Sequence, residues 1–436
     1  MHDNAALAAA ADRAETVVPL FVLDDALLGR TGAPNRIAFL LDALHDLDSS
    51  LRSRGTALVV RRGDAVAEAM RVALEVDAEA VYLAEDVSGY ARARERRLRQ
   101  AAGAARVEVE LGPGVTVVPP GDVAPSGGGD AFLVFTPYWN RWREVPRRGI
   151  LPAPGRLAAH GVGAGRIPVL GELSDEAAVP GLPEGGETAG RVRLERWLAD
   201  GLAAYDEQRD DLAGDGTSGL SPYLHFGCLS PSEVAQRAAS RPGGEAFARQ
   251  LCWRDFHHQL LSSRPALAHD DMRSRGDAWR DDPEALAAWK EGRTGYPLVD
   301  AGMRQLASEG TMHNRARLVT ASFLTKHLYL DWRAGAEHFA AHLVDGDVAN
   351  NALNWQWVAG TGADTRPNRV FNPTRQARRY DPTGEYVRRH VPELESFEGG
   401  DVHEPWRAWL LGPLDYPAPI VDHDEAVERF RRARAA

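Results

Sequence analysis

The sequence predicts two folded parts in one chain: a Rossmann-like α/β N-terminal domain and a larger, all-helical C-terminal domain. The chain has 436 residues, which is too long for one ordinary hydrophobic core. Short β-branched runs alternate with amphipathic stretches up to about residue 120, as is typical of a parallel sheet with crossover helices. Strand signals stop at about residue 191, and helical patterns follow one another from there.

Each element is expected where its periodicity is clearest. The expected strands are 17–23, 57–62, 80–86 and 106–111, and the helices between them are 34–53, 64–76 and 90–102. The later helices are expected at 191–209, 230–239, 244–262, 283–290, 297–309, 314–328, 333–344 and 347–358. Glycine and proline are concentrated in 121–190, which predicts a connector with one apolar segment, FLVFTPYWNRW. We therefore expect domains at 1–120 and 191–436, joined by a linker at 121–190.

Composition excludes several classes of protein. Hydrophobic residues make up 44% and charged residues 26% of the chain, as in folded globular proteins. No apolar run approaches the roughly 18 residues that span a bilayer, and the acidic start lacks the basic region of a secretory signal. Cys228 and Cys252 are the two cysteines, too few for a disulfide framework or a cysteine-built metal site. We expect a cytoplasmic protein whose net charge of −11 still leaves room for a local basic groove.

Five tryptophans of the helical part have polar or charged neighbours. They are Trp253, Trp279, Trp332, Trp355 and Trp357. Tryptophan most often fills a core, but core aromatics usually have apolar neighbours. This pattern favours either electron transfer through indoles or stacking against planar ligands.

Three further segments suggest contacts with phosphate. Residues 214–231 form a loop rich in small and hydroxyl residues, which suits a diphosphate or an ordinary capped turn. Asn314 and Arg317 lie one turn apart, as at a phosphate contact or a solvated helix end. Residues 365–390 carry seven arginines against two acids, which indicates a nucleic-acid backbone contact or a surface patch.

Together these segments resemble the photolyase/cryptochrome family, and most of all its class I photolyases for cyclobutane pyrimidine dimers (deoxyribodipyrimidine photo-lyases). The resemblance covers nearly the whole chain. It rests on TSGLSPYL, WRDFHHQL, WKEGRTGYPLVDAGMRQL, MHNRARLVTASFLTKHLYLDWR, DGDVANNALNWQW, FNPTRQ and HEPW. It implies an antenna-type α/β domain and a helical domain that binds FAD and UV-damaged DNA. The implied activity is that of a carbon–carbon lyase, the light-driven repair of pyrimidine dimers, and we expect a monomer without an obligatory protein partner.

The resemblance also implies which residues face the cofactor. The FAD-binding residues would be Tyr205, Thr217, Ser218, Gly219, Leu220, Ser221, Arg254, Asn314, Asp345, Gly346 and Asp347. Trp355, Trp332 and Trp279 match the family's electron-transfer chain from flavin to surface. Asn351 would face flavin N5, where a neutral amide favours the reduced anionic flavin over a stable neutral radical. A folate or a deazaflavin in the α/β domain would serve as antenna chromophore, and the sequence does not separate the two.

A second set of residues would contact the DNA. By resemblance it comprises Arg209, Gln250, Trp253, Asn314, Arg315, Trp357, Arg369 and Gln376. Trp253 and Trp357 would hold the dimer, which photolyases flip out of the duplex, since base–aromatic stacking is worth about 1–3 kcal/mol per base. The arginines would position the DNA backbone without reading its sequence.

Three departures from the family pattern affect the expected substrate and fold. Gln250, expected to touch the lesion during catalysis, stands where dimer photolyases carry Glu, and Gln is more familiar in (6-4) photolyases. Leu318 replaces a Met of similar volume. His313 precedes Asn314 instead of forming the paired histidines of (6-4) chemistry, so the dimer remains the expected substrate. The alternatives are a (6-4) photolyase, a cryptochrome-like blue-light photoreceptor, or a DNA-binding flavoprotein that has lost its activity.

The third departure concerns the start at MHDNAALAAA. Family members have a strand before this motif, and we expect the N-terminal domain to lack it. That strand would be buried on both faces of a parallel sheet, so its loss should weaken the domain. We expect a misassigned start codon rather than a damaged domain.

Overall fold

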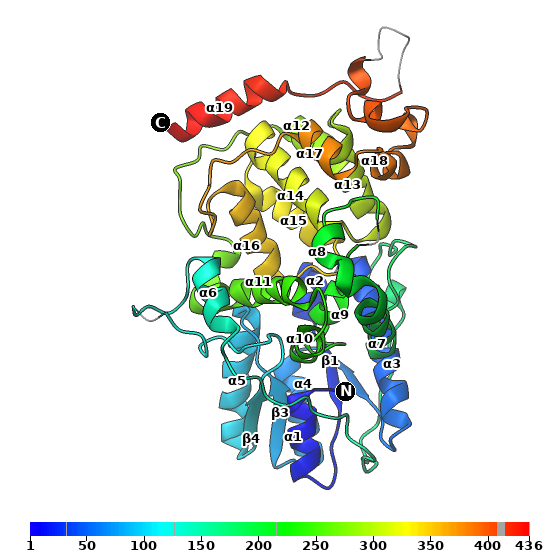
Figure 1. Cartoon of the computed structure of the whole chain (residues 1–436). Helices are drawn as coiled ribbons and strands as arrows, with labels where there is room; N and C mark the ends of the chain where they lie inside the picture. The colour runs from blue at the N-terminus through cyan, green and yellow to red at the C-terminus, as the bar shows by residue number, and fades with distance from the viewer. Residues whose placement is uncertain (32, 126, 215, 408–414, 436) are drawn as a thin grey trace. The chain divides into compact units, whose positions relative to one another are not determined.

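The computed structural model describes residues 1–31, 33–125, 127–214, 216–407 and 415–435 (Figure 1). By packing, the chain divides into two compact units. Unit 1 comprises Met1–Ala178, Pro183–Ala203 and Ser218–Ala266, and unit 2 comprises Val179–Leu182, Ala204–Thr217 and Leu267–Ala436. These units do not coincide with the domains expected from the sequence, whose boundaries stay predictions.

Four short parallel strands form the sheet portion of unit 1. β1 (Leu20–Leu23) pairs with β2 (Val59–Arg62), and β3 (Ala80–Ala84) pairs with β4 (Glu108–Gly112). Each overlaps a predicted run, so the predicted α/β class is confirmed. In the described residues these strands make two separate two-stranded sheets rather than one continuous sheet.

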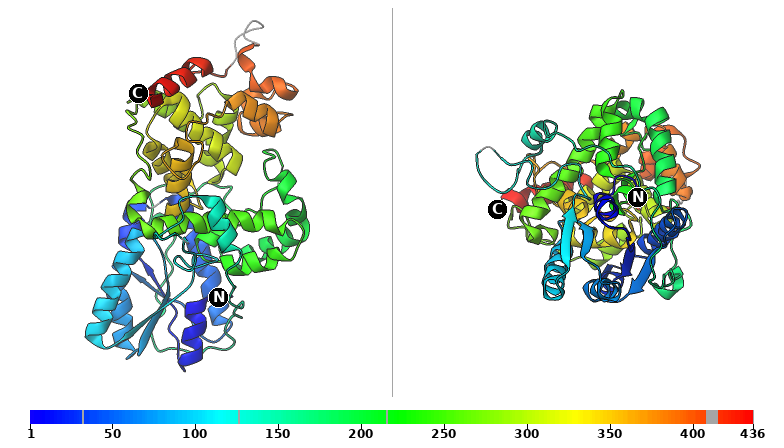
Figure 2. Two further views of the ribbon diagram at one scale, coloured as in Figure 1. Left: turned by 60° about the vertical axis from the view of Figure 1, so that its left-hand side comes forward. Right: turned by 90° about the horizontal axis from the view of Figure 1, so that it is seen from below.

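A helix that the sequence reasoning did not predict packs against β3 and β4. It is α1 (Ala5–Arg13; Figure 2), an alanine-rich segment with high helix propensity. The Asn4 side chain caps it. The other helices of this part are α2 (Asp25–Thr31), α3 (Pro34–Arg52), α4 (Ala65–Glu75) and α5 (Gly89–Ala105). Pro34, Asp64 and Ser88 supply ordinary start signals for the last three.

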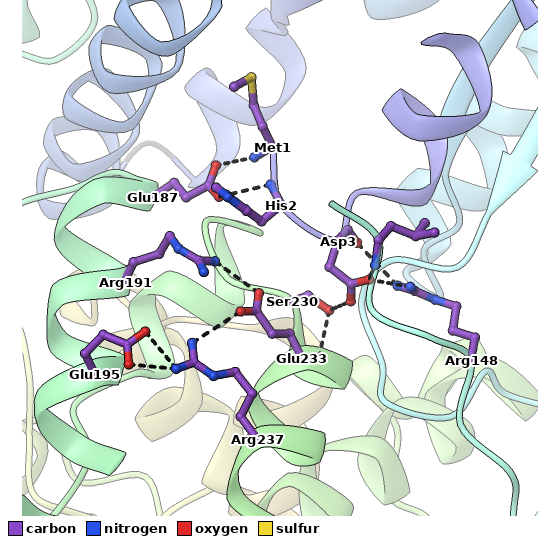
Figure 3. Close-up of polar contacts among 11 residues, drawn as sticks. Met1, His2, Asp3, Arg148, Glu187, Arg191, Glu195, Ser230, Glu233 and Arg237 are labelled. Carbon is purple, nitrogen blue, oxygen red and sulfur yellow. Dashed lines mark hydrogen bonds and ion pairs between the residues drawn. The ribbon is translucent and has the colours of Figure 1, made fainter. Parts of the chain in front are cut away.

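Polar contacts tie the first residues of the chain to helices far along the sequence within unit 1 (Figure 3). The buried Asp3 carboxylate accepts hydrogen bonds from the Leu151 N–H at 2.9 Å, and also from Arg148 and Ser230. Glu187, in α7 (Glu187–Arg196), accepts from the N–H of His2 at 3.0 Å. The segment before α1 is therefore fixed to α7 and to the start of α10 (Pro231–Ala239).

The predicted apolar segment of the connector forms a helix. α6 (Phe135–Trp142) packs against α11 (Gly244–Ser263) in unit 1. The carboxylate of Asp255 in α11 is 1% exposed and accepts three hydrogen bonds: from the indole N–H of Trp142 at 2.8 Å and from the N–H groups of Val117 and Val118 at 3.1 and 2.9 Å. Because three donors compensate this buried carboxylate, it anchors the connector rather than leaving a costly buried charge.

After the strands, the regular elements of the described residues are helices, as predicted. Their bounds are α7 (Glu187–Arg196), α8 (Tyr205–Gln208), α9 (Ser221–His225), α10 (Pro231–Ala239), α12 (Pro283–Lys290), α13 (Pro297–Glu309), α14 (Asn314–Ser322), α15 (Trp332–His342), α16 (Val348–Ala359), α17 (Pro373–Tyr380), α18 (Glu385–His390) and α19 (His423–Ala435). Short 3-10 turns lie at Leu170–Glu172, Leu202–Ala204, Pro265–Ala268, Pro392–Leu394 and Gly399–His403. No helix among the described residues is both long and apolar enough to cross a bilayer.

Two predicted helices change their hydrogen-bond pattern before they end. The segment predicted at 191–209 passes from α7 into a π-helical turn at Trp197–Gly201, and the one at 314–328 passes from α14 into a π-helical turn at Phe323–Leu328. Tyr329 then takes a left-handed conformation with φ 54°, which ends the second one. Periodicity in the sequence does not separate α from π geometry.

A large hydrophobic core holds unit 2 together. It includes Trp289, Trp332 and Trp355, each at most 2% exposed, with Met303 and Phe323 fully buried beside them. In unit 1, smaller clusters lie around the strands, and Tyr138 and Phe256 are buried in its helical part.

Candidate functional site

The two acids before α16 have different local partners. Asp347 caps the helix, since its carboxylate accepts hydrogen bonds from the backbone N–H and the side-chain amide of Asn350, both at 2.7 Å. Asp345 is bound by Arg317, whose Nη2 lies 3.1 and 3.0 Å from the two carboxylate oxygens. Gly346 separates the two acids. A charge-compensated carboxylate next to a helix N-terminus can receive hydroxyl and N–H donors of a polar ligand.

Asn351 has an oriented side-chain amide. Its Nδ2 donates to the carbonyl of Ala336 in α15 at 2.8 Å. Within the part of the chain that the structure describes, no hydrogen bond to its Oδ1 is recorded. The carbonyl oxygen of the amide is therefore left as an acceptor, which suits the predicted position of Asn351 facing flavin N5 when N5 carries a proton.

Trp355 lies one turn after Asn351 and is 2% exposed. Its ring packs on Gly335, where an added Cβ would collide with the indole, and it meets Phe339 edge-on at 4.9 Å between ring centroids. Its indole N–H has no hydrogen-bond partner among the described residues. A buried N–H without a partner is costly, and an acceptor on a bound ligand would remove that cost.

The other two members of the predicted tryptophan chain also belong to unit 2. Trp332 is 1% exposed, and its indole N–H donates to Asp271 at 2.8 Å. Trp279 is half-buried, and its ring lies 5.0 Å from that of Tyr329. Among the aromatic pairs of the described residues, none joins two of these three tryptophans directly.

The predicted phosphate loop is shaped by an arginine that the sequence reasoning missed. Arg193 of α7 donates from Nε to the carbonyl of Ser218 at 2.7 Å. Gly219 has φ +60°, and a Cβ there would collide with the Arg193 guanidinium, so glycine is required. Leu220 donates its N–H to the Ser218 hydroxyl at 3.3 Å, just before α9 begins at Ser221. Arg193 lies 25 residues before Ser218 and belongs to no sequence motif, so the sequence alone did not indicate this contact.

The predicted FAD-binding residues are distributed over both units. Unit 1 holds Ser218, Gly219, Leu220, Ser221 and Arg254, and unit 2 holds Tyr205, Thr217, Asn314, Asp345, Gly346 and Asp347. Arg254 donates to the carbonyls of Val115 and Leu224, the latter at 3.5 Å. Burial raises the pKa of Tyr205 to about 12, so its phenol stays protonated.

Helix α11 presents Gln250 and Trp253 one turn apart in unit 1. The Trp253 ring stacks on Phe135 of α6, with centroids 3.7 Å apart and planes 2° from parallel. The guanidinium of Arg249 lies 5.1 Å from the Phe135 centroid. Phe135 and Arg249 therefore back the predicted lesion contact, although the sequence marked 132–142 only as an apolar segment.

Trp357 and Arg369 come together in unit 2. The Arg369 guanidinium lies 4.8 Å from the Trp357 ring centroid and 5.0 Å from that of Phe371. Its nearest acid is Asp364 at 3.8 Å. An arginine held on an aromatic face keeps its N–H groups directed at its rim, where a phosphate can accept them.

Two of the remaining predicted DNA contacts are arginines that already pair with acids. Arg315 pairs with Asp210 at 2.7 Å and stacks on Tyr380 at 4.3 Å, and Arg209 pairs with Asp206 at 3.2 Å. A phosphate would have to compete with these acids. Gln376 has a buried Oε1 without a partner among the described residues, while Asn314 is exposed at the start of α14.

Each unit holds polar groups of a kind that a flavin dinucleotide needs. In unit 1, the Arg193-backed turn at Gly219 suits a phosphate group, and in unit 2, the Arg317–Asp345 pair can receive the hydroxyl donors of a ribose. The Asn351 oxygen and the unpaired Trp355 indole N–H supply an acceptor and a donor next to each other on α16.

Comparisons with known proteins show the family to which this chain belongs. Residues 1–155 match the DNA photolyase family model, and residues 247–436 match the FAD binding domain of DNA photolyase. A deoxyribodipyrimidine photo-lyase of Streptomyces griseus is 54% identical over 441 residues, covering 100% of this chain and 96% of that protein. A bacterial class III photolyase from Agrobacterium tumefaciens has a TM-score of 0.92 at 35% identity, covering 100% of this chain and 94% of its own. A Synechocystis cryptochrome also reaches 0.92, at 30% identity, with 99% and 96% covered.

Proposed function

Because this chain belongs to the DNA photolyase family, we propose that it uses blue light to repair cyclobutane pyrimidine dimers in UV-damaged DNA. FAD is its cofactor, and when bound it supplies the light-excited electron that opens the cyclobutane ring. The observation that carries the proposal is the combination of Asn351 and Trp355 on α16 beside the Arg317–Asp345 pair.

The residues of the chain have separate tasks. Asp345, held by Arg317, and Asp347, at the start of α16, hold polar groups of the cofactor. Asn351 offers an amide oxygen at the flavin ring. Because this side chain is uncharged, it does not repel the negative charge of the reduced ring. Trp355, Trp332 and Trp279 refill the cofactor with electrons after it has been oxidised.

The DNA side depends on aromatic and cationic side chains. Trp253, backed by Phe135, and Trp357, beside Arg369, stack on the flipped dimer. Gln250 contacts the edge of the pyrimidines by donating and accepting hydrogen bonds through its amide. Arg209 and Arg315 approach the DNA backbone after their present acidic partners are exchanged for phosphate, and Gln376 contacts it through its side-chain amide.

The proposed enzyme is a cytoplasmic monomer with a folate or a deazaflavin as its antenna. Light scattering of the purified protein would test the monomer, and the absorption spectrum of the chromophore released on denaturation would separate folate from deazaflavin. A flavin as the released second chromophore would contradict both choices.

A repair assay tests the activity itself. The protein is photoreduced and mixed with an oligonucleotide that carries one thymine dimer, and loss of the lesion is followed under blue light and in the dark. We expect loss only in the light, which would also show that Gln250 is tolerated in place of a carboxylate.

A parallel oligonucleotide with a (6-4) lesion separates the alternatives. Repair of that lesion alone would show that the protein is a (6-4) photolyase and not a dimer photolyase. Gln250 is the residue that favours this alternative. Repair of neither lesion by protein with bound, reduced FAD would favour the photoreceptor alternative, which the similarity to the Synechocystis cryptochrome supports.

A further inference from the structure

Tyr329 lies against Trp279, the half-buried end of the proposed tryptophan chain. The two ring centroids are 5.0 Å apart, with the planes at 49°. Two hydrogen bonds from Arg280 hold their segments side by side: its backbone N–H donates to the carbonyl of Tyr329 at 2.9 Å, and its guanidinium donates to the carbonyl of Leu328 at 3.1 Å. The ring contact is therefore supported by one backbone and one side-chain hydrogen bond next to both residues.

The phenol of Tyr329 has a carboxylate partner. Its Oη donates to Asp277 Oδ1 at 3.0 Å. The Asp277 side chain is 2% exposed and is held by Arg434, whose Nη2 lies 2.8 Å from Oδ2. Burial, with the Asp277 hydrogen bond, raises the pKa of Tyr329 to about 12, so the resting phenol keeps its proton. Oxidation makes a phenol strongly acidic, and at that moment Asp277 is in place to accept its proton.

This combination of contacts distinguishes Tyr329 from another buried tyrosine of unit 2. Tyr386 donates its hydroxyl to the neutral Gln305 amide at 2.8 Å, and its recorded ring neighbour is His390 at 4.8 Å. Among the described residues, Tyr329 is the tyrosine whose ring packs against Trp279. Tyr386 is therefore a matched control, with a buried, hydrogen-bonded hydroxyl but no recorded tryptophan partner.

We propose, on the basis of the tryptophan chain in the proposed function, that Tyr329 is a further redox-active residue that reduces oxidised Trp279. Tyr329 gives one electron to the Trp279 radical cation, which becomes neutral tryptophan. The phenol proton passes to Asp277 Oδ1, and a neutral tyrosyl radical remains. A thiol reductant from solution then returns a hydrogen atom to Tyr329, and Asp277 releases its proton to water. Transfer of the oxidised site away from Trp279 lengthens the time in which the cofactor keeps its new electron.

Pulse radiolysis of the holoprotein in the dark tests the step without light-driven chemistry. Azide radicals oxidise tryptophan in preference to tyrosine, and absorption then follows tryptophan and tyrosyl radicals separately. In the wild type we expect tyrosyl absorption to grow at the rate at which tryptophan radical decays. Tyr329→Phe and Trp279→Phe should each lose most of this growth, whereas Tyr386→Phe should keep it. An unchanged tyrosyl yield in Tyr329→Phe would overturn the proposal.

Asp277→Asn tests the proton acceptor. It should slow the growth several-fold and make its rate depend on buffer concentration, since the proton must then leave to solvent. If tyrosyl absorption grew at the same rate in this variant as in wild type, Asp277 would not be the proton acceptor.

Flash photolysis of the same variants separates this step from the proposed function. Long-lived tyrosyl radical after a blue flash in wild type, and its absence in Tyr329→Phe, is expected. Radiolysis could show that Tyr329 reduces oxidised Trp279 while the flash produces no tryptophan radical. That result would leave the proposed step intact and contradict the light-driven tryptophan chain.

Discussion

The predicted tryptophans lie in two kinds of surroundings. Trp355 and Trp332 are enclosed in the core of unit 2, and among the described residues the indole N–H of Trp355 has no partner while that of Trp332 donates to one carboxylate. Trp253 and Trp357 are only half-buried, and a neighbouring side chain supports each: the Phe135 ring for the first and the Arg369 guanidinium for the second. Trp279, the outer member of the proposed electron-transfer chain, is half-buried as well. The proposed function thus gives one residue type two tasks: burial excludes water from the inner redox-active indoles, whereas a supported and half-exposed ring is available for stacking.

The largest expected effect comes from Trp355→Phe, because the first link of the proposed electron-transfer chain is lost. Light-driven reduction of the oxidised cofactor should fall by more than an order of magnitude, measured as the loss of flavin absorption under blue light with a thiol donor. Trp289→Phe is the matched control, since Trp289 lies 6.0 Å from Trp355 in the same core but outside the proposed chain. Equal losses in the two variants would show that only core packing was disturbed.

Trp253→Ala should weaken the binding of dimer-containing DNA by about 1–3 kcal/mol, because one stacking surface is removed. Titration of a labelled duplex with and without a dimer measures this effect. Affinity for undamaged duplex should stay close to that of wild type. A uniform loss for both duplexes would mean that Trp253 supports the fold or the DNA backbone contact rather than the lesion.

Burial in the core of unit 2 predicts a pH dependence of stability. Burial, with His342 and Lys290 nearby, lowers the pKa of His338 to about 3. A histidine in the unfolded chain titrates near pH 6.5, so the unfolded state binds the extra proton below that pH. The stabilising contribution is fully present above about pH 6.5 and is lost as pH falls toward about 3, by roughly 1–2 kcal/mol at pH 5.

Denaturant unfolding between neutral and mildly acid pH measures this loss. His338→Phe should make the dependence shallower, whereas substitution of the exposed His45 by Gln should leave it unchanged. The same slope in His338→Phe and wild type would assign the acid sensitivity to other groups.

Phe135→Ala has the smallest expected effect, about 0.5–1.5 kcal/mol on dimer binding, the usual contribution of an aromatic pair. It should also shift the fluorescence of Trp253, because one face of that ring becomes exposed. The exposed Leu133 in the same connector provides a control, Leu133→Ala. An effect of Phe135→Ala on all DNA alike would contradict a role in positioning Trp253.

Local signals predicted most of the elements. Pro297 and Gly310 bound α13 where expected, and Gly310 ends it in a left-handed conformation with φ 65°. The separation of the strands into two pairs was not predictable, since strand pairing is a long-range choice. The π-helical turn before Tyr329 was equally hidden, because it keeps the helical periodicity of α14.

Pairings between distant segments were the least predictable part of the site. Nothing in FLVFTPYWNRW specifies that Phe135 stacks on Trp253, and nothing near Gly219 indicates that Arg193 approaches it. The Arg317–Asp345 pair also joins separate segments, although each partner falls in a segment that the sequence had singled out. The sequence thus indicates which residues matter, while their partners depend on tertiary packing.

The most direct test of the division between the two tryptophan groups uses protein whose cofactor has been reduced chemically before the assay. Repair of a thymine dimer per absorbed photon is compared for wild type, Trp355→Phe and Trp357→Ala. The account predicts near wild-type repair by Trp355→Phe, because its refilling step is bypassed, and reduced repair by Trp357→Ala at limiting DNA. Loss of repair by reduced, FAD-bound Trp355→Phe would contradict it.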